Sequence, residues 1–175
     1  MKILSFGAST SSTSINRQLA AYAASLIPNA TVTDLDLRRF SLPIYSADEE
    51  TSNGISQAAH AFKEMIKTHD GIVVSLAEHN GSYSAAFKNL YDWTSRIDVK
   101  VWAGKPMLLL STSPGGRGGA SVMEAGKATF PRMGADLKAT FSLPSFYDNF
   151  ADGKITDPAL DAELQTAVVA FCQSY

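Results

Sequence analysis

The stretch GIVVSL, residues 71–76, decides the fold class, because it is almost entirely apolar and too short for an ordinary helix. A run of this kind is expected of a β-strand that helices cover on both faces, as in a parallel sheet. The run MLLL at residues 107–110 has the same character. We therefore expect both runs to be central strands of one parallel sheet.

Outward from these two runs, strand and helix patterns alternate five times. We expect strands at residues 3–6, 31–37, 71–76, 107–110 and 136–143. Apolar residues at three- and four-residue spacing indicate helices at residues 19–27, 55–66, 87–97, 120–131 and 158–171. Asp157 suits the N-cap of the last helix and Pro158 its first position. The alternation predicts an α/β fold with helices on both faces of an open, mostly parallel sheet.

Between the second strand and second helix, residues 38–53 are expected to form a polar connection, in which residues 46–53 look like a mobile excursion. No repeat or low-complexity tract interrupts the chain. Because 175 residues suit one hydrophobic core, residues 1–175 are predicted to form a single domain.

Composition excludes several classes of protein. Hydrophobic residues make up 45% and charged residues 18% of the chain, as in ordinary globular proteins. A formal net charge of −2 provides no broad field for nucleic acid or anionic lipid, so neither is expected as a partner. The single cysteine, Cys172, permits neither an internal disulfide nor a thiolate metal cluster. We expect no membrane span and no secretion signal, and we place the protein in the cytoplasm by default.

In open parallel sheets, ligands bind beyond the carboxyl ends of the strands, where the winding direction reverses. The loops at residues 7–16, 77–84 and 113–119 follow the first, third and fourth expected strands. All three are rich in polar groups or glycine. They are therefore the candidate binding loops.

The first loop, GASTSSTSIN at residues 7–16, contains six consecutive hydroxyl side chains just before a helix. Free N–H groups and the positive end of the helix dipole attract anions there. Ser9, Ser11, Ser14 and the amide of Asn16 could surround a phosphate without a cationic side chain. A single cap would use only one hydroxyl.

Other phosphate-binding patterns are missing from this loop. The lysine of a P-loop is absent, as is the second glycine of a dinucleotide fingerprint. Neither a nucleophilic cysteine nor the acidic strand ends of a magnesium-binding receiver domain are present. An uncharged site for a phosphate monoester suits FMN best.

In the second loop and the helix after it, AEHNGSYSAAFKNLYDW at residues 77–93, the chain resembles the flavodoxin-like NADPH-dependent FMN reductase family. That family includes quinone, chromate and azo-dye reductases. The matches are Ser14-Ile15-Asn16 in the first loop, a Gly-rich loop at 115–119, and Glu78, Asn80, Ser82, Lys88, Asn89, Asp92 and Trp93. The chain departs from the family pattern at Ala8, Ser11, Ala77, His79 and Ser84-Ala85.

The resemblance implies a three-layer αβα sandwich with a five-stranded parallel sheet in the order 2-1-3-4-5. It also implies a set of FMN contacts. The phosphate would be held by Ser9, Ser11, Ser14, Ile15 and Asn16. The ring system would be lined by Glu78, His79, Asn80 and Ser82, and its other side covered by Ser113, Gly115, Gly116 and Arg117.

The activity that the resemblance implies is transfer of hydride from NADPH or NADH to FMN, and of electrons onward to a small acceptor, by a ping-pong mechanism. The flavin performs the chemistry, so we expect no catalytic side chain and no metal. The family usually forms homodimers, for which Tyr91, Trp93 and Trp102 could supply interface aromatics, although core packing explains them equally. A flavodoxin-type electron carrier and a cofactor-free sensor or interaction domain remain alternatives.

Overall fold

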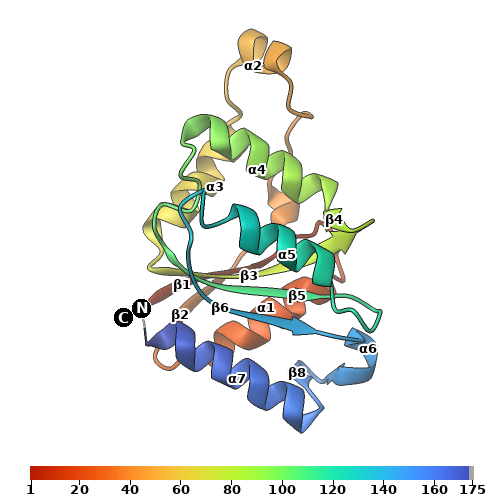
Figure 1. Cartoon of the computed structure of the whole chain (residues 1–175). Coiled ribbons are helices and arrows are strands. Elements are labelled where there is room, and N and C mark those ends of the chain that lie inside the picture. Colours follow the sequence, from red (N-terminus) through yellow and green to blue (C-terminus); the bar gives the residue numbers. More distant parts are fainter. Residues whose placement is uncertain (174–175) are drawn as a thin grey trace.

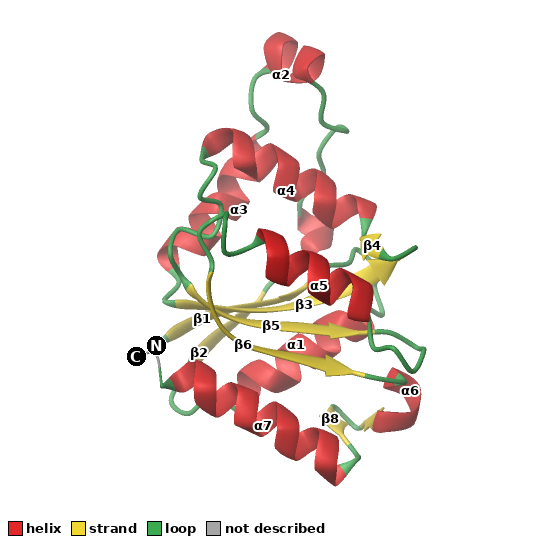
Figure 2. Ribbon diagram, in the orientation of Figure 1, coloured by secondary structure: helices red, strands yellow, loops and turns green. Residues whose placement is uncertain are grey.

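The computed structural model describes residues 1–173 of the chain. Five parallel strands form its central sheet in the spatial order β2, β1, β3, β5, β6. Their bounds are Thr31–Asp34 for β2, Lys2–Gly7 for β1, Gly71–His79 for β3, Pro106–Thr112 for β5 and Asp136–Leu143 for β6. Counting the parallel strands alone, this is the predicted order 2-1-3-4-5, so the predicted fold is confirmed (Figure 2).

Helices cover both faces of this sheet (Figure 1). One face carries α1 (Ile15–Ser25) and α7 (Pro158–Cys172), and the other carries α3 (Gln57–Thr68), α4 (Ala85–Ile97) and α5 (Ala120–Thr129). Successive strand residues point to opposite faces. In β3, Val74 therefore joins the core under α3, α4 and α5, whereas Val73 joins the core under α1 and α7.

Polar caps define where the helices begin. The side chains of Ser14, Ser56 and Ser84 accept hydrogen bonds from the first turns of α1, α3 and α4. Asp157 caps α7 as predicted, with Pro158 at its first position. Each cap supplies a partner to N–H groups that have none inside the helix.

The predicted polar connection at residues 38–53 contains regular structure that the sequence analysis missed. A short 3-10 helix, η1, covers Leu37–Arg39, so the second strand ends at Asp34 and not at residue 37. Ser46 caps α2 (Ala47–Asn53), which projects beyond α4 in Figure 1. The stretch expected to be a mobile excursion, residues 46–53, is therefore largely helical.

The second candidate loop, expected at residues 77–84, begins later in the structure than the sequence predicted. Strand β3 continues to His79 and forms a hairpin with β4 (Ser82–Tyr83). Asn80 and Gly81 have φ values of 52° and 76°, the left-handed conformation that two-residue hairpin turns require. Near the end of the chain, α6 (Phe146–Asn149) leads into a hairpin of β7 (Phe150–Ala151) and β8 (Lys154–Ile155), which no pattern had predicted.

The three candidate interface aromatics belong to the core of this chain. Tyr91, Trp93 and Trp102 are all buried, and Tyr91 and Trp102 pack against Phe130. Core packing therefore accounts for them. Among the described residues, none of the helices combines the length and apolar character needed to cross a bilayer.

Candidate functional site

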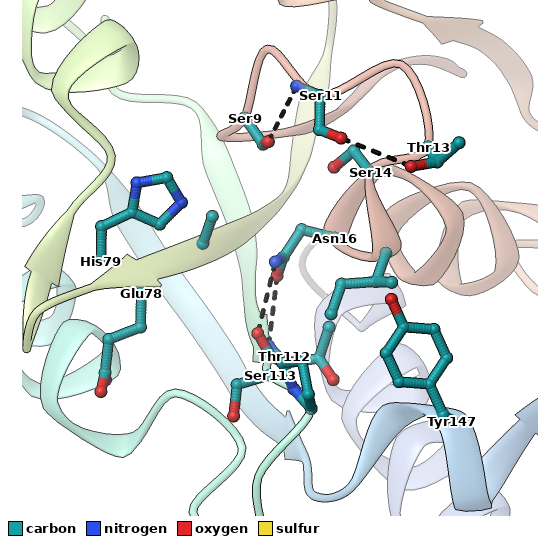
Figure 3. Close-up of a pocket in the computed structure, with 13 residues that line it drawn as sticks. Ser9, Ser11, Thr13, Ser14, Asn16, Glu78, His79, Thr112, Ser113 and Tyr147 are labelled. Atoms are coloured by element: carbon teal, nitrogen blue, oxygen red, sulfur yellow. Dashed lines mark hydrogen bonds between the residues drawn. The ribbon is translucent and has the colours of Figure 1, made fainter.

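A pocket of about 200 Å³ lies at the carboxyl ends of β1, β3 and β5 (Figure 3). From β1 the chain passes to β2 on one side of the sheet and then to β3 on the other, so the winding reverses here. We call this cavity the hydroxyl pocket. It is lined by Ser9, Ser11, Thr13, Ser14, Ile15, Asn16, Ala77, Glu78, His79, Thr112, Ser113, Pro114 and Tyr147.

The first wall of the pocket is the loop from β1 to α1. A Cβ on Gly7 would lie 2.3 Å from the main-chain nitrogen of Arg17, so only glycine allows the strand end to approach the helix start this closely. The Ser14 hydroxyl caps α1 by accepting from the N–H of Arg17 at 3.1 Å. In the described residues 1–173, the N–H groups of Thr13, Ile15 and Asn16 donate to no protein acceptor, which leaves them for a ligand.

The side chain of Asn16 links α1 to β3 and β5 by hydrogen bonds beneath this loop. Its Oδ1 accepts from the Ser75 hydroxyl at 2.7 Å and from the main-chain N–H of Thr112 at 3.2 Å. Its Nδ2 donates to the Thr112 carbonyl at 3.3 Å. The side chain is only 4% exposed, so its main contribution is to fix α1 against β3 and β5.

The second wall is the end of β3, where neighbouring side chains diverge (Figure 3). The Glu78 carboxylate accepts from the main-chain N–H of Val122 in the first turn of α5, at 3.0 Å. His79 points to the other side, toward the loop that carries Ser9 and Ser11. Glu78 therefore braces α5, while the imidazole of His79 is left at the rim of the pocket.

The third wall is the loop at residues 113–119, which a neighbouring segment holds in place. The N–H groups of Ser145 and Phe146 donate to the carbonyls of Gly115 and Ser113 at 3.0 and 3.1 Å. The same segment brings Tyr147 into the pocket, with its hydroxyl directed toward the first loop (Figure 3). Arg117 lies outside the pocket and donates to the Ser121 hydroxyl on α5.

The structure brings most of the predicted site residues together. Ser9, Ser11, Ser14, Ile15, Asn16, Glu78, His79 and Ser113 line the pocket. The remaining predicted residues lie outside its lining, in the β3–β4 hairpin or the third loop: Asn80, Ser82, Gly115, Gly116 and Arg117. Sequence reasoning missed Thr13, Ala77, Thr112, Pro114 and Tyr147. Four of these are sequence neighbours of predicted residues. Tyr147 follows a different strand, β6, and no sequence pattern marked it as a site residue.

Among the described residues, no lysine or arginine lines the hydroxyl pocket. Arg17, in the first turn of α1, donates to Asp34 and Asp36, so its charge is already paired. The hydrogen bond to Asp34 also raises the pKa of Arg17. A phosphate in this pocket would depend on hydroxyl and N–H donors. In residues 1–173, no group of three or more histidine, cysteine, aspartate or glutamate side chains is placed to hold a metal ion.

Known proteins share this fold. FerB of Paracoccus denitrificans, described as a flavoenzyme NAD(P)H:(acceptor) oxidoreductase, superposes with a TM-score of 0.77 at 25% identity, covering 98% of this chain and 95% of that one. A point mutant of flavodoxin from Pseudomonas aeruginosa gives a TM-score of 0.53 at 19% identity, covering 98% of this chain and 99% of that one. The architecture and the site at the winding reversal thus define a flavodoxin-like protein.

Sequence comparison narrows this class to a family. The chain belongs to the NADPH-dependent FMN reductase family, whose model matches residues 1–148. The 2-hydroxy-1,4-benzoquinone reductase of a Burkholderia species is 38% identical over 109 residues, which are 61% of this chain and 57% of that protein. The chain spans about half the length of the curated relatives it matches.

Proposed function

We propose that the hydroxyl pocket binds FMN and that the protein uses it to pass electrons from NADPH or NADH to a small neutral acceptor of the quinone type. The observation that carries the proposal is the set of unpaired donors at the start of α1. The N–H groups of Thr13, Ile15 and Asn16 have no protein acceptor, and these residues line a pocket that several hydroxyls line and that no described cationic side chain lines. Such a donor set fits a phosphate monoester.

The remaining walls fit the rest of FMN. Ser9, Ser11 and Ser14 would donate to its phosphate, and Thr112, Ser113 and Tyr147, which also line the pocket, would lie beside the rest of the cofactor. Main-chain groups of β3 from Ala77 to His79 would face the polar edge of the ring system. The family membership supports this orientation.

When bound, FMN supplies two-electron transfer chemistry. The overall reaction is NAD(P)H + H⁺ + quinone → NAD(P)⁺ + quinol, which balances without a metal or a further reductant. The protein's own residues bind and orient. Asn16 keeps the first loop against the sheet, and Glu78 keeps α5 against the end of β3. His79 lies at the rim of the pocket, beside the second cavity that adjoins it.

The deciding experiment is a visible spectrum of the purified protein before and after addition of FMN, then NADPH, then a short-chain quinone. We expect the spectrum of protein-bound FMN, its bleaching by NADPH, and its recovery with the quinone. Initial-rate plots that stay parallel as the acceptor varies would support the ping-pong order. A protein that leaves FMN free and NADPH unoxidised would contradict the proposal.

The same measurement separates the two alternatives. A flavodoxin-type electron carrier would take up FMN without oxidising NADPH at a catalytic rate. A cofactor-free sensor or interaction domain would not take up FMN at all. The near-neutral charge of the chain argues against the carrier, because flavodoxins are generally strongly acidic around the flavin.

The proposal also includes a homodimeric, cytoplasmic protein that folds as one domain. Support for assembly and location comes from the family resemblance and from composition alone. Sedimentation velocity of the FMN-loaded protein is expected to give twice the monomer mass of 18.7 kDa. Fractionation of the native host is expected to recover the protein from the cytoplasm.

A further inference from the structure

A groove leads away from the hydroxyl pocket along the start of α4. A second cavity, of about 460 Å³, shares Ser9, Ser11 and His79 with the pocket. A third cavity, of about 350 Å³, shares Ala85 and Ala86 with the second. The shared residues make the three cavities neighbours in a row. We call the second and third cavities together the α4 groove.

The walls of the α4 groove are largely apolar at its far end. The methyl groups of Ala85 and Ala86 are exposed on one side, and Phe40, Leu42 and Ile44 lie on the other. Ser41 and Asn89 are the polar residues that line this end, and both polar atoms of the Asn89 side chain are already hydrogen-bonded, to Tyr45 and Pro43. This end therefore offers apolar surface and few unpaired polar groups.

The α4 groove contains no formal charge that could recognise an ion. None of its described lining residues is a lysine, arginine, aspartate or glutamate, and His79 is the one histidine among them. An oxyanion or a sulfonated dye would lose hydration here without gaining a counterion. The chemistry of the groove favours a neutral occupant.

The wall opposite α4 is held in a fixed position. We call residues 40–45 the strap. Asn89 of α4 accepts from the N–H of Tyr45 and donates to the Pro43 carbonyl, both at 2.9 Å. The indole N–H of Trp93 also donates to the Pro43 carbonyl, at 2.8 Å, and the ring packs edge-on against Tyr45. The groove is thus present before any ligand arrives, which lowers the cost of binding.

We propose that the α4 groove binds the apolar side chain of the electron acceptor, so that the acceptors used best are neutral quinones carrying an alkyl substituent. The inference rests on the proposed function for the position of the reacting ring, which would lie near His79, where the groove begins. The substituent would then extend between the strap and α4. Both cavities fall within the size range of small-molecule sites.

The test compares quinones that share one ring and differ only in alkyl chain length, with the FMN-loaded enzyme. Each buried methylene is expected to raise kcat/KM about fourfold until the groove is filled. Ile44→Ser removes apolar surface at a side chain that is 78% exposed, so the fold should survive the change. We expect this variant to lower the preference for the long chain about fivefold. Val99→Ser alters an exposed apolar residue beyond the opposite end of α4 and should leave the preference unchanged.

A binding measurement separates this inference from the proposed function. The probe is the dimethyl ether of the long-chain quinol, which cannot accept electrons, titrated calorimetrically into wild-type protein and the Ile44→Ser variant. Binding that weakens in the variant supports the groove even if no quinone is reduced. Equal kcat/KM for short and long chains, with no binding of the ether, overturns the inference while leaving quinone reduction intact. A change of sedimenting mass in Ile44→Ser without a chain-length effect would instead assign the groove to a second copy of the chain.

Discussion

The carboxylate of Glu78 accepts a hydrogen bond from the main-chain N–H of Val122 at 3.0 Å, and so joins the end of β3 to the first turn of α5. The N-cap of α5 is Gly119, which has no side chain to cap the helix. Glu78 supplies that cap from a distant part of the chain. Because both the end of β3 and the loop before α5 line the hydroxyl pocket, this bond sets the spacing of two of its walls.

Glu78→Ala is expected to destabilise the fold by about 1 kcal/mol, as loss of a helix cap does, and to weaken FMN binding. Glu78→Gln keeps an acceptor oxygen and should retain most of both. Denaturant unfolding and FMN titration measure the two effects. Glu124→Ala, which removes an exposed carboxylate from the same helix, serves as the control. Equal FMN affinity in Glu78→Ala and wild type would contradict the bracing role.

Asn16→Asp should lower both stability and FMN affinity. The change removes the donor to the Thr112 carbonyl and places a buried carboxylate near that oxygen, at a cost of about 2 kcal/mol. It also introduces negative charge beside the expected phosphate, so FMN affinity should fall at least about tenfold. Gln18→Glu adds the same charge at an exposed position on α1 and should change neither quantity by much. Unchanged FMN affinity in Asn16→Asp would place the phosphate elsewhere.

Lys63 is expected to be a major stabilising residue although it lies far from the pocket. Its side chain is 2% exposed, and its ammonium group donates to Asp98 and to the carbonyls of Lys100 and Val101. Lys63→Met removes these three hydrogen bonds, although Asp98 still accepts from the N–H of Lys100 and the Lys100 carbonyl from that of Ala103. We expect a loss of about 3 kcal/mol in the free energy of unfolding. Lys67→Met, at an exposed site on the same helix, should be close to neutral. A small effect at residue 63 would show that water replaces the ammonium group.

Tyr22 provides a prediction for alkaline pH. Burial, together with the hydrogen bond from its hydroxyl to Asp161, raises the pKa of Tyr22 to about 12. Because the folded state holds the proton more tightly, this group contributes stability that is fully present below pH 10 and is lost as pH rises toward 12. Unfolding measured between pH 9 and 12 should show a steeper loss in wild type than in Tyr22→Phe. Identical slopes would contradict the assignment.

Much of the fold was predictable because its signals are local. Buried strands such as residues 71–76, and caps such as Asp157, can be recognised from a few adjacent residues. Helix α2 was missed because it buries no apolar stripe and depends on the Ser46 cap. The β3–β4 hairpin was missed although Asn80-Gly81 is a strong turn signal, because its residues were assigned to a binding loop.

The site was predictable only in part, for a similar reason. The hydroxyls of the first loop can be recognised in the sequence because they are consecutive. Tyr147, by contrast, lines the pocket because hydrogen bonds join two loops that are distant in the sequence. The true partner of Glu78, the N–H of Val122, lies 44 residues away in the sequence. Contacts of that range depend on tertiary packing, which local patterns do not encode.

The central claim is that the start of α1 binds the phosphate of FMN, and the most direct test compares FMN with riboflavin, which lacks only that phosphate. Quenching of flavin fluorescence on titration with the protein gives both dissociation constants. If the N–H groups of Thr13, Ile15 and Asn16 hold the phosphate, FMN should bind on the order of a hundredfold more tightly. Equal affinity for the two flavins, or binding of neither, would contradict the account.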